Sequence, residues 1–166
     1  MVTTAYQDIE KWILTTLSTK SPVFNGLPPC PYAKSAWLDN KVFVHHLNDK
    51  FPLHTWITAE LENYTYHWPK SKEVVVLAFD PDKITASELS GILDAAKPML
   101  DKRGYTALED HPYDVEQVGD VVLNQGSWAL ILLQETAKLT EARTWLESKD
   151  YYKNWDPDYK KSVQQR

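Results

Sequence analysis

The sequence has little cysteine, little glycine and no excess of basic residues. Its 166 residues include one cysteine and five glycines, and the formal net charge is -5. A single thiol excludes a disulfide within the chain. No Walker loop or GxGxxG motif is present, which argues against nucleotide binding through a glycine-rich loop. Because phosphate neutralisation needs a basic face, we expect no nucleic-acid partner.

Long apolar runs are also missing. No stretch of about 18 apolar residues occurs, so we expect no membrane partner. The first residues, MVTTAYQDIEKW, are amphipathic and acidic, unlike a signal peptide. Without an export signal, a lone thiol predicts a cytoplasmic protein. The length and the ordinary globular composition predict a single domain over residues 1–166.

Hydrophobic periodicity predicts six helices. Residues 4–18 carry an apolar stripe, and Thr4 with Gln7 has the spacing of a capping box. Thr85 and Glu88 repeat that spacing at the start of a helix that should run to about residue 102, with Gly104 as its C-terminal stop. The other helices are predicted over residues 31–39, 52–68 and 140–148, and from Asp156-Pro157 onward.

Four segments read as strands: residues 41–47, 73–79, 105–109 and 127–135. The run EVVVLAF is apolar and β-branched, which predicts a central strand covered on both sides. SWALILLQE predicts a second buried strand. Between the last two strands, DHPYDVEQVGD reads as a polar loop.

The order of these elements predicts the fold class. Residues 73–148 read β-α-β-β-α, which is most of a ferredoxin-like unit, and residues 41–47 supply a further strand from the N-terminal side. We therefore expect an α+β, ferredoxin-like two-layer sandwich with a mixed or antiparallel sheet. The helices should lie mainly on one face, with extra helices at the N- and C-terminal ends.

The only cysteine stands in GLPPCPYAKSAW, next to a predicted helix start. Pro31 would take the first helical position, so unpaired amides and the helix dipole would stabilise a thiolate at Cys30. Lys34, one turn on, would add positive charge. The alternative is that Cys30 is a small buried hydrophobic residue.

Two resemblances involve this segment. CPYAKSAWLDNKVFV resembles the start of a glutaredoxin, whose active helix begins Cys-Pro-Tyr-Cys, although Ala33 replaces the second cysteine. More of the chain resembles a bacterial family of unknown function with a Gly-Leu-x-x-Cys-Pro-Phe-Ala-Lys element, a later His-Pro element and an Asn-x-Ser element. The similar positions are Gly26, Leu27, Cys30, Pro31, Tyr32, Ala33, Lys34, His111, Pro112, Tyr113 and Asn124. This resemblance implies a shared site but no established reaction, and Gln125, Gly126 and Trp128 stand where the family usually has an arginine and prolines.

A second cluster of reactive side chains lies in LEDHPYD. Glu109, Asp110 and Asp114 surround His111, and carboxylates beside an imidazole orient it for acid–base chemistry. The alternative is a solvent-exposed acidic turn. If Cys30 and His111 meet in space, they form a nucleophile and a base with an acid behind.

Metal ligation is less well supported. No HExxH or paired CxxC motif occurs, and His45 and His46 point to opposite faces of one strand. We therefore predict no metal ligands, and a mixed Cys/His/carboxylate site remains only a third alternative. No cofactor is indicated.

The main functional hypothesis is a small cytoplasmic enzyme that acts on a small molecule. Cys30, His111, Glu109 and Asp110 would be catalytic, in thiol-mediated group transfer or hydrolysis, with the reaction class open. Substrate would be bound by Tyr32, Lys34, Tyr113, Asn124 and Trp128. The alternative is a non-catalytic ligand-binding or assembly module, compatible with a homo-oligomer, in which the aromatic segment KDYYKNWDPDY forms an interface.

Overall fold

The protein is described here by a computed structural model that covers residues 3–48 and 51–166. The longer helices are α1 (Ala5–Thr15), α3 (Leu53–Tyr66), α4 (Ala86–Arg103) and α5 (Thr136–Ser148). The shorter ones are α2 (Ala33–Leu38), α6 (Pro157–Gln164) and the 3-10 turns η1 (Pro22–Phe24) and η2 (Pro81–Lys83). The strands are β1 (Val42–His46), β2 (Val74–Phe79), β3 (Tyr105–Asp110), β4 (Gln117–Val118), β5 (Val121–Val122) and β6 (Ala129–Glu135).

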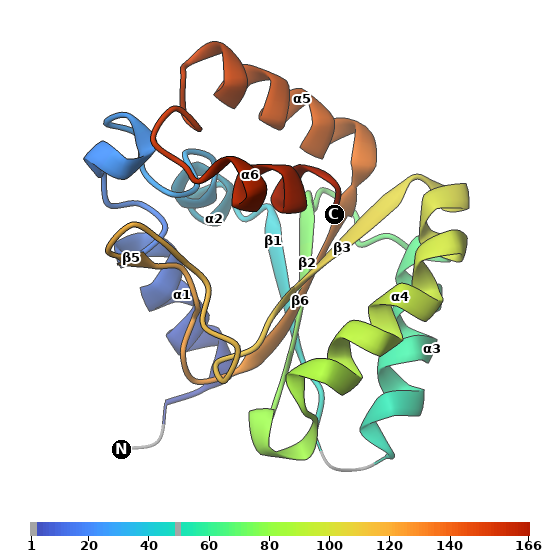
Figure 1. The fold of residues 1–166 in the computed structure, drawn as a ribbon. Coiled ribbons are helices and arrows are strands. Elements are labelled where there is room, and N and C mark those ends of the chain that lie inside the picture. The colour runs from blue at the N-terminus through green and yellow to red at the C-terminus, as the bar shows by residue number, and fades with distance from the viewer. Residues whose placement is uncertain (1–2, 49–50) are drawn as a thin grey trace.

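The main sheet has four strands in the order β1-β2-β6-β3 (Figure 1). β1 pairs with β2 in parallel, and β6 pairs antiparallel with both β2 and β3. The two strands with the longest apolar runs, β2 and β6, therefore occupy the centre of the sheet. The predicted α+β class with a mixed sheet is confirmed, as is the central position of EVVVLAF.

The topology contains a split β-α-β unit, because β2 and β3 are joined through α4 while β6 lies between them. The fourth strand, β1, comes from the N-terminal side and reaches β2 through α3, a crossover that parallel pairing requires. In a full β-α-β-β-α-β order, a strand would follow the second helix. Here α5 is followed by α6, so the chain has the split unit without that last strand.

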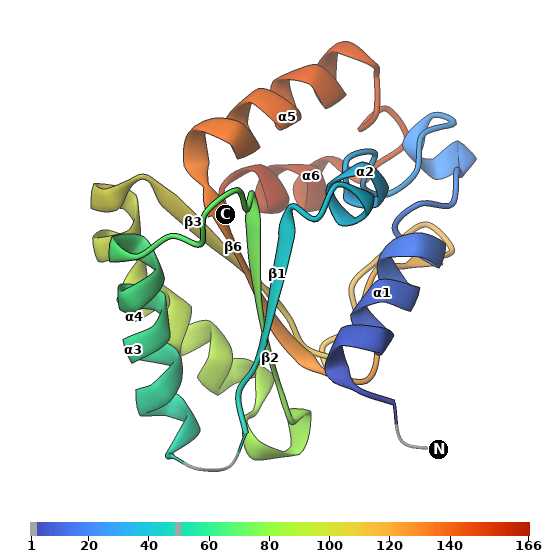
Figure 2. The same cartoon turned by 180° about the vertical axis from the view of Figure 1, so that it is seen from behind.

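Helices cover both faces of the sheet (Figures 1 and 2). On one face, Val75, Leu77 and Ile131 pack with side chains of α3 and α4. On the other face, Val76 and Leu130 pack with α1 and α2. This differs from the expectation of helices mainly on one face. The physical reason lies in β2, whose side chains are apolar on both faces and need cover on both.

The predicted helix caps are present. The Thr4 hydroxyl accepts a hydrogen bond from Gln7 N at 3.2 Å, and that of Thr85 accepts one from Glu88 N at 3.1 Å. Both pairs form complete capping boxes. Gly104 ends α4 with a φ of 80°, in the left-handed region that glycine adopts without strain.

Two local predictions were wrong. α5 begins at Thr136 rather than at residue 140. Thr136 directly follows the last residue of β6, and its backbone N–H donates a hydrogen bond to Gly104 O at 2.9 Å, which fixes the start of the helix there. The segment read as a polar loop, residues 110–120, contains strand β4 and the turn of the short hairpin β4–β5, which turns at Gly119 with a φ of 59°. Val118 of this hairpin is 4% exposed, because it packs against Phe24 in a separate cluster.

That separate cluster joins the two ends of the chain. Phe24, Val118, Tyr151 and Tyr152 are buried together, and Trp155 packs on them. Asn154 Nδ2 also donates to Pro22 O at 2.8 Å. The aromatic segment at residues 150–159 therefore anchors the C-terminal part of the chain on the loop after α1. None of the described helices is long and apolar enough to cross a membrane.

Candidate functional site

A cavity of about 220 Å³ lies at the junction of α1, the loop before α2, the β3–β6 pair and α6. Its apolar wall is formed mainly by Trp12, Leu108, Leu132, Tyr151, Trp155 and Tyr159. Its polar side chains are Glu109, Asp110, Glu116, Asn124, Arg143 and Arg166. Three of the residues predicted from sequence, Glu109, Asp110 and Asn124, thus come together at one cavity.

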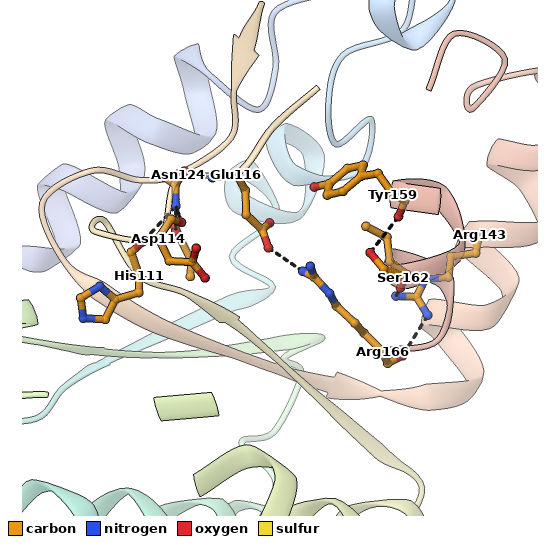
Figure 3. Close-up of polar contacts among 10 residues, drawn as sticks. His111, Asp114, Glu116, Asn124, Arg143, Tyr159, Ser162 and Arg166 are labelled. Atoms are coloured by element: carbon orange, nitrogen blue, oxygen red, sulfur yellow. Dashed lines mark hydrogen bonds and ion pairs between the residues drawn. The ribbon is translucent and has the colours of Figure 1, made fainter. Parts of the chain in front are cut away.

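Asn124 holds the polar end of this cavity together (Figure 3). Its amide nitrogen donates to Asp110 Oδ1 at 2.8 Å, to His111 O at 3.1 Å and to Asp114 O at 3.0 Å. Its carbonyl oxygen accepts from Glu116 N at 2.7 Å. The side chain of Asn124 therefore holds residues 110–116, at the end of β3 and in the loop that follows, in one conformation.

Asp110 and Glu109 are both carboxyl groups in a desolvating environment. Burial raises the pKa of Asp110, although hydrogen bonds from the Gln125 amide and from Asn124 oppose the rise. Burial likewise raises the pKa of Glu109, opposed by a hydrogen bond from Ser90 and by the charge of Arg166. Glu109 Oε2 is buried and has no hydrogen-bond partner among the described residues. Of these two carboxyl groups, Glu109 is therefore the one with an unpartnered buried oxygen.

We expect Glu109→Gln to change how stability depends on pH. The folded-state pKa of Glu109 lies above its unfolded value, so the folded protein binds the proton more tightly. The free energy of unfolding therefore falls as pH rises from the unfolded-state pKa, about 4, to the folded-state value, and it stays lower above that. Urea unfolding between pH 4 and pH 7 should show a shallower fall for the variant. A parallel profile would mean that Glu109 is fully compensated.

His111 is 4% exposed, and both of its ring nitrogens are engaged. Nε2 lies 2.7 Å from Ile84 O, so it carries the proton, while Nδ1 accepts from Tyr113 N at 3.2 Å. The ring thereby ties the loop after β3 to the segment before α4. It borders a hollow of about 10 Å³, which has room for a single water molecule.

Cys30 follows Pro29, a residue of the cavity wall, but does not itself line the cavity. Desolvation raises the pKa of its thiol, while hydrogen bonds from the backbone amides of Tyr32 and Ala33 act in the opposite direction. The amides expected at the start of the helix are thus present, but burial outweighs them. Pro29 and Asp110 line the cavity, whereas Cys30 and His111 do not. No described contact joins the sulfur to the imidazole.

Alkylation of Cys30 should therefore be slow in the folded protein. A thiol with a raised pKa forms little thiolate, which is the reactive species. At pH 8 we expect iodoacetamide to react roughly tenfold or more slowly with folded protein than with protein unfolded in urea. Mass spectrometry of timed samples measures both rates, with free cysteine in the same buffers as control. Faster reaction of the folded protein would contradict the desolvated environment.

The remaining predicted substrate-binding residues lie apart from the cavity. Tyr32 packs on Trp145 with ring centroids 5.7 Å apart, and Lys34 is exposed. The Tyr113 hydroxyl donates to Asp82 Oδ1 at 2.5 Å. Trp128 Nε1 donates to Asp8 Oδ2 at 2.9 Å. Each makes local contacts in a different part of the molecule. Across residues 3–48 and 51–166, no group of three or more His, Cys, Asp or Glu side chains is placed to hold a metal ion.

Sequence reasoning missed the basic side of the cavity. Arg143 of α5 donates to the backbone oxygens of Val163 at 3.2 Å and Arg166 at 3.3 Å, and no Asp or Glu side chain among the described residues pairs with it. Desolvation lowers the pKa of Arg143. Arg166 pairs with Glu116 at 2.7 Å (Figure 3).

A signal for Arg143 was available in the sequence. Leu139, Arg143 and Leu146 are spaced by four and three residues, so the arginine shares a helical face with two leucines. A charged residue on such a face indicates a buried or functional guanidinium. No comparable pattern indicates Trp155, whose buried Nε1 has no hydrogen-bond partner among the described residues.

The resemblances to glutaredoxin and to a bacterial family of unknown function stay predictions. Comparison with known proteins finds no family model, curated protein or solved structure that matches this chain. The chemistry of the cavity is therefore argued from its own side chains.

Proposed function

We propose that the protein is a non-catalytic module that binds a small carboxylic acid with an apolar body in the cavity lined by Trp12, Tyr151 and Trp155. One observation carries the proposal: among the residues that line this cavity, a guanidinium has only backbone partners and an indole N–H has no acceptor. Arg143 is half-buried without a side-chain carboxylate, and Trp155 Nε1 is buried without an acceptor. Groups of this kind normally have partners, because a buried donor left unpaired costs free energy.

Most of the other polar groups of the cavity are already engaged. Asp110 accepts hydrogen bonds from Asn124 and Gln125, and Glu116 pairs with Arg166. Glu109 Oε2 is an acceptor without a partner among the described residues, so the groups of the cavity that can bind an anion are the donors of Arg143 and Trp155. A carboxylate suits them, because hydrogen bonds between a guanidinium and a carboxylate are among the strongest in proteins.

The apolar wall determines the shape and size of the part of the ligand that is not the carboxylate. Aromatic side chains surround the cavity, and they favour a flat or aliphatic body that displaces water. The volume of about 220 Å³ is below the roughly 300 Å³ at which drug-sized ligand sites begin. The ligand should therefore be no larger than one ring with a short acidic side chain.

The enzymatic alternative requires a thiolate beside an available base. The raised pKa of Cys30 and the engagement of both His111 nitrogens favour binding over thiol catalysis. A cytoplasmic location and a homo-oligomeric state stay predictions.

The test uses benzoate and phenylacetate as probes, with benzamide and benzylamine as neutral and cationic analogues. Saturation-transfer NMR and calorimetry should show binding of the two acids and at least about tenfold weaker binding of the analogues. Arg143→Met should weaken acid binding by at least about tenfold, since a hydrogen bond to a charged group contributes roughly 1.5–3 kcal/mol. Trp155→Phe keeps a ring but removes the N–H, and it should weaken binding less.

Lys138→Met is the matched control, because Lys138 is an exposed cation on the same helix. It should leave acid binding unchanged. Thermal unfolding of each variant separates loss of binding from loss of folding. Equal binding of benzamide and benzoate, or unchanged binding by folded Arg143→Met, would refute the proposal.

A further inference from the structure

A second hollow, which shares Leu108, Glu109 and Arg166 with the carboxylate site, runs along the free edge of the sheet. It measures about 280 Å³ and lies between α4 and α6, with β3 as its floor. Five consecutive residues of β3, from 105 to 109, line it. In Figure 1, β3 is the last strand of the sheet and passes between these two helices.

The outer edge of β3 has unpaired backbone groups. β3 pairs with β6 on one side only. Among the described residues, no hydrogen bond reaches the N–H and C=O groups that β3 directs away from β6. Such a row of donors and acceptors is a template for another strand. The hollow between α4 and α6 leaves this edge partly open, because β3 residues 105–109 line it and are partly exposed.

The charges along the hollow are not balanced. Lys97 pairs with Asp101 at 3.0 Å, and the other base, Arg166, pairs with Glu116 at 2.7 Å. Asp94 and Glu109 remain, and neither makes an ion pair within the described part of the chain. Glu109 Oε2 is moreover buried without a hydrogen-bond partner. An occupant with a positive charge would complement both carboxylates.

We propose that β3 accepts an extended peptide segment of a partner protein as a fifth strand, with a lysine or arginine of that segment placed between Asp94 and Glu109. Main-chain hydrogen bonds to β3 would supply affinity, and side chains on alternate positions would supply specificity. On the face that carries Tyr105 and Ala107, the segment would meet the apolar side chains of α4, Leu93 and Leu100. The preferred sequence therefore alternates apolar and basic residues.

The probe is a blocked hexapeptide of alternating valine and lysine, which matches the six residues of β3. In ¹⁵N-labelled protein, its addition should shift the amide signals of residues 105–109 and of the facing turns of α4. The same peptide with glutamate in place of lysine, and a lysine peptide N-methylated at alternate residues in either register, should each bind at least about tenfold more weakly. Methylation removes the backbone donors that strand pairing needs.

Two substitutions test whether the carboxylates of Asp94 and Glu109 attract the positive charge of the peptide. Asp94 is exposed, so Asp94→Asn should fold normally and weaken peptide binding several-fold. Glu109→Gln should weaken it about tenfold, since a charged hydrogen bond is lost. Asp120→Asn, at an exposed carboxylate of the β4–β5 turn, is the control that should change nothing. Arg143→Met should also leave peptide binding intact, which separates this site from the carboxylate cavity.

Several results would overturn the proposal. One is the absence of binding by the lysine peptide. Others are equal binding of the N-methylated or glutamate peptides, or shifts outside β3 and its flanking helices. Concentration-dependent self-association that protects the β3 amides would show that the occupant is a second copy of this chain. Displacement of the peptide by lysine or n-butylamine at similar concentrations would indicate a small-molecule cation site.

Discussion

Asn124→Ala should lower the free energy of unfolding by about 2–4 kcal/mol and should abolish ligand binding in the adjacent cavity. The substitution removes the donor for Asp110 Oδ1, His111 O and Asp114 O, and the acceptor for Glu116 N. Each buried polar group left unpaired costs roughly 1–3 kcal/mol, although partial hydration of the loop reduces the sum. Urea unfolding measures the loss, and amide hydrogen exchange should show that residues 111–116 lose protection.

Asn154→Ala provides the control. Asn154 is exposed and makes one described hydrogen bond, to Pro22 O at 2.8 Å, so its loss should cost less than about 1 kcal/mol. Equal effects of the two substitutions would mean that the Asn124 network does not hold the loop. Asn124→Asp is informative as well. This variant would place a second carboxylate beside Asp110. The destabilisation of the variant at pH 7 should therefore become smaller as the pH is lowered and one of the two carboxylates is protonated.

Ile131→Ala should be the most destabilising of the changes considered, with a loss of about 2–5 kcal/mol. Ile131 is 0% exposed and lies in the middle of β6, opposite Leu77 of β2 and Glu109 of β3. Its side chain packs in the core formed with α3 and α4. Strands pair with β6 on both sides of this position, so the cavity left by the truncation should collapse only partly.

A graded series tests the packing argument. Ile131→Val removes one methylene and should cost about 0.5–1.5 kcal/mol. Val122→Ala, at a residue that is 47% exposed in the β4–β5 hairpin, should cost under about 0.5 kcal/mol. Urea unfolding followed by tryptophan fluorescence measures all three. A loss below 1 kcal/mol for Ile131→Ala would mean that the sheet centre is not closely packed.

The sequence predicted the regular elements well where periodicity and capping agreed. β2 and β6 are apolar on both faces, and this alone indicated central strands. Thr85, Glu88 and Gly104 marked both ends of α4. Thr136 was missed because polar residues begin α5 without a cap, so the boundary depends on the tertiary contact with Gly104. The β4–β5 hairpin depends on packing of Val118 against Phe24, which no local pattern records.

The candidate site was predictable only in its local part. Glu109 and Asp110 end β3 and Asn124 precedes β6, so antiparallel pairing of the two strands brings these residues to the same end of the sheet. Arg143 and Trp155 come from segments that follow the sheet, and their approach depends on the packing of α5 and α6. For Cys30, the amides of the helix start were predictable, but the desolvation that outweighs them was not.

The aromatic cluster around Phe24 has a consequence for how the chain acquires its shape during translation. All four main strands are complete once residue 135 has left the ribosome, so the sheet can form early. Phe24 must wait for Tyr151 and Trp155, which leave the ribosome after the last strand of the sheet. The cavity therefore closes after the sheet has formed, and a chain stalled with only residues 1–135 outside the ribosome should expose Phe24 to solvent beside the sheet.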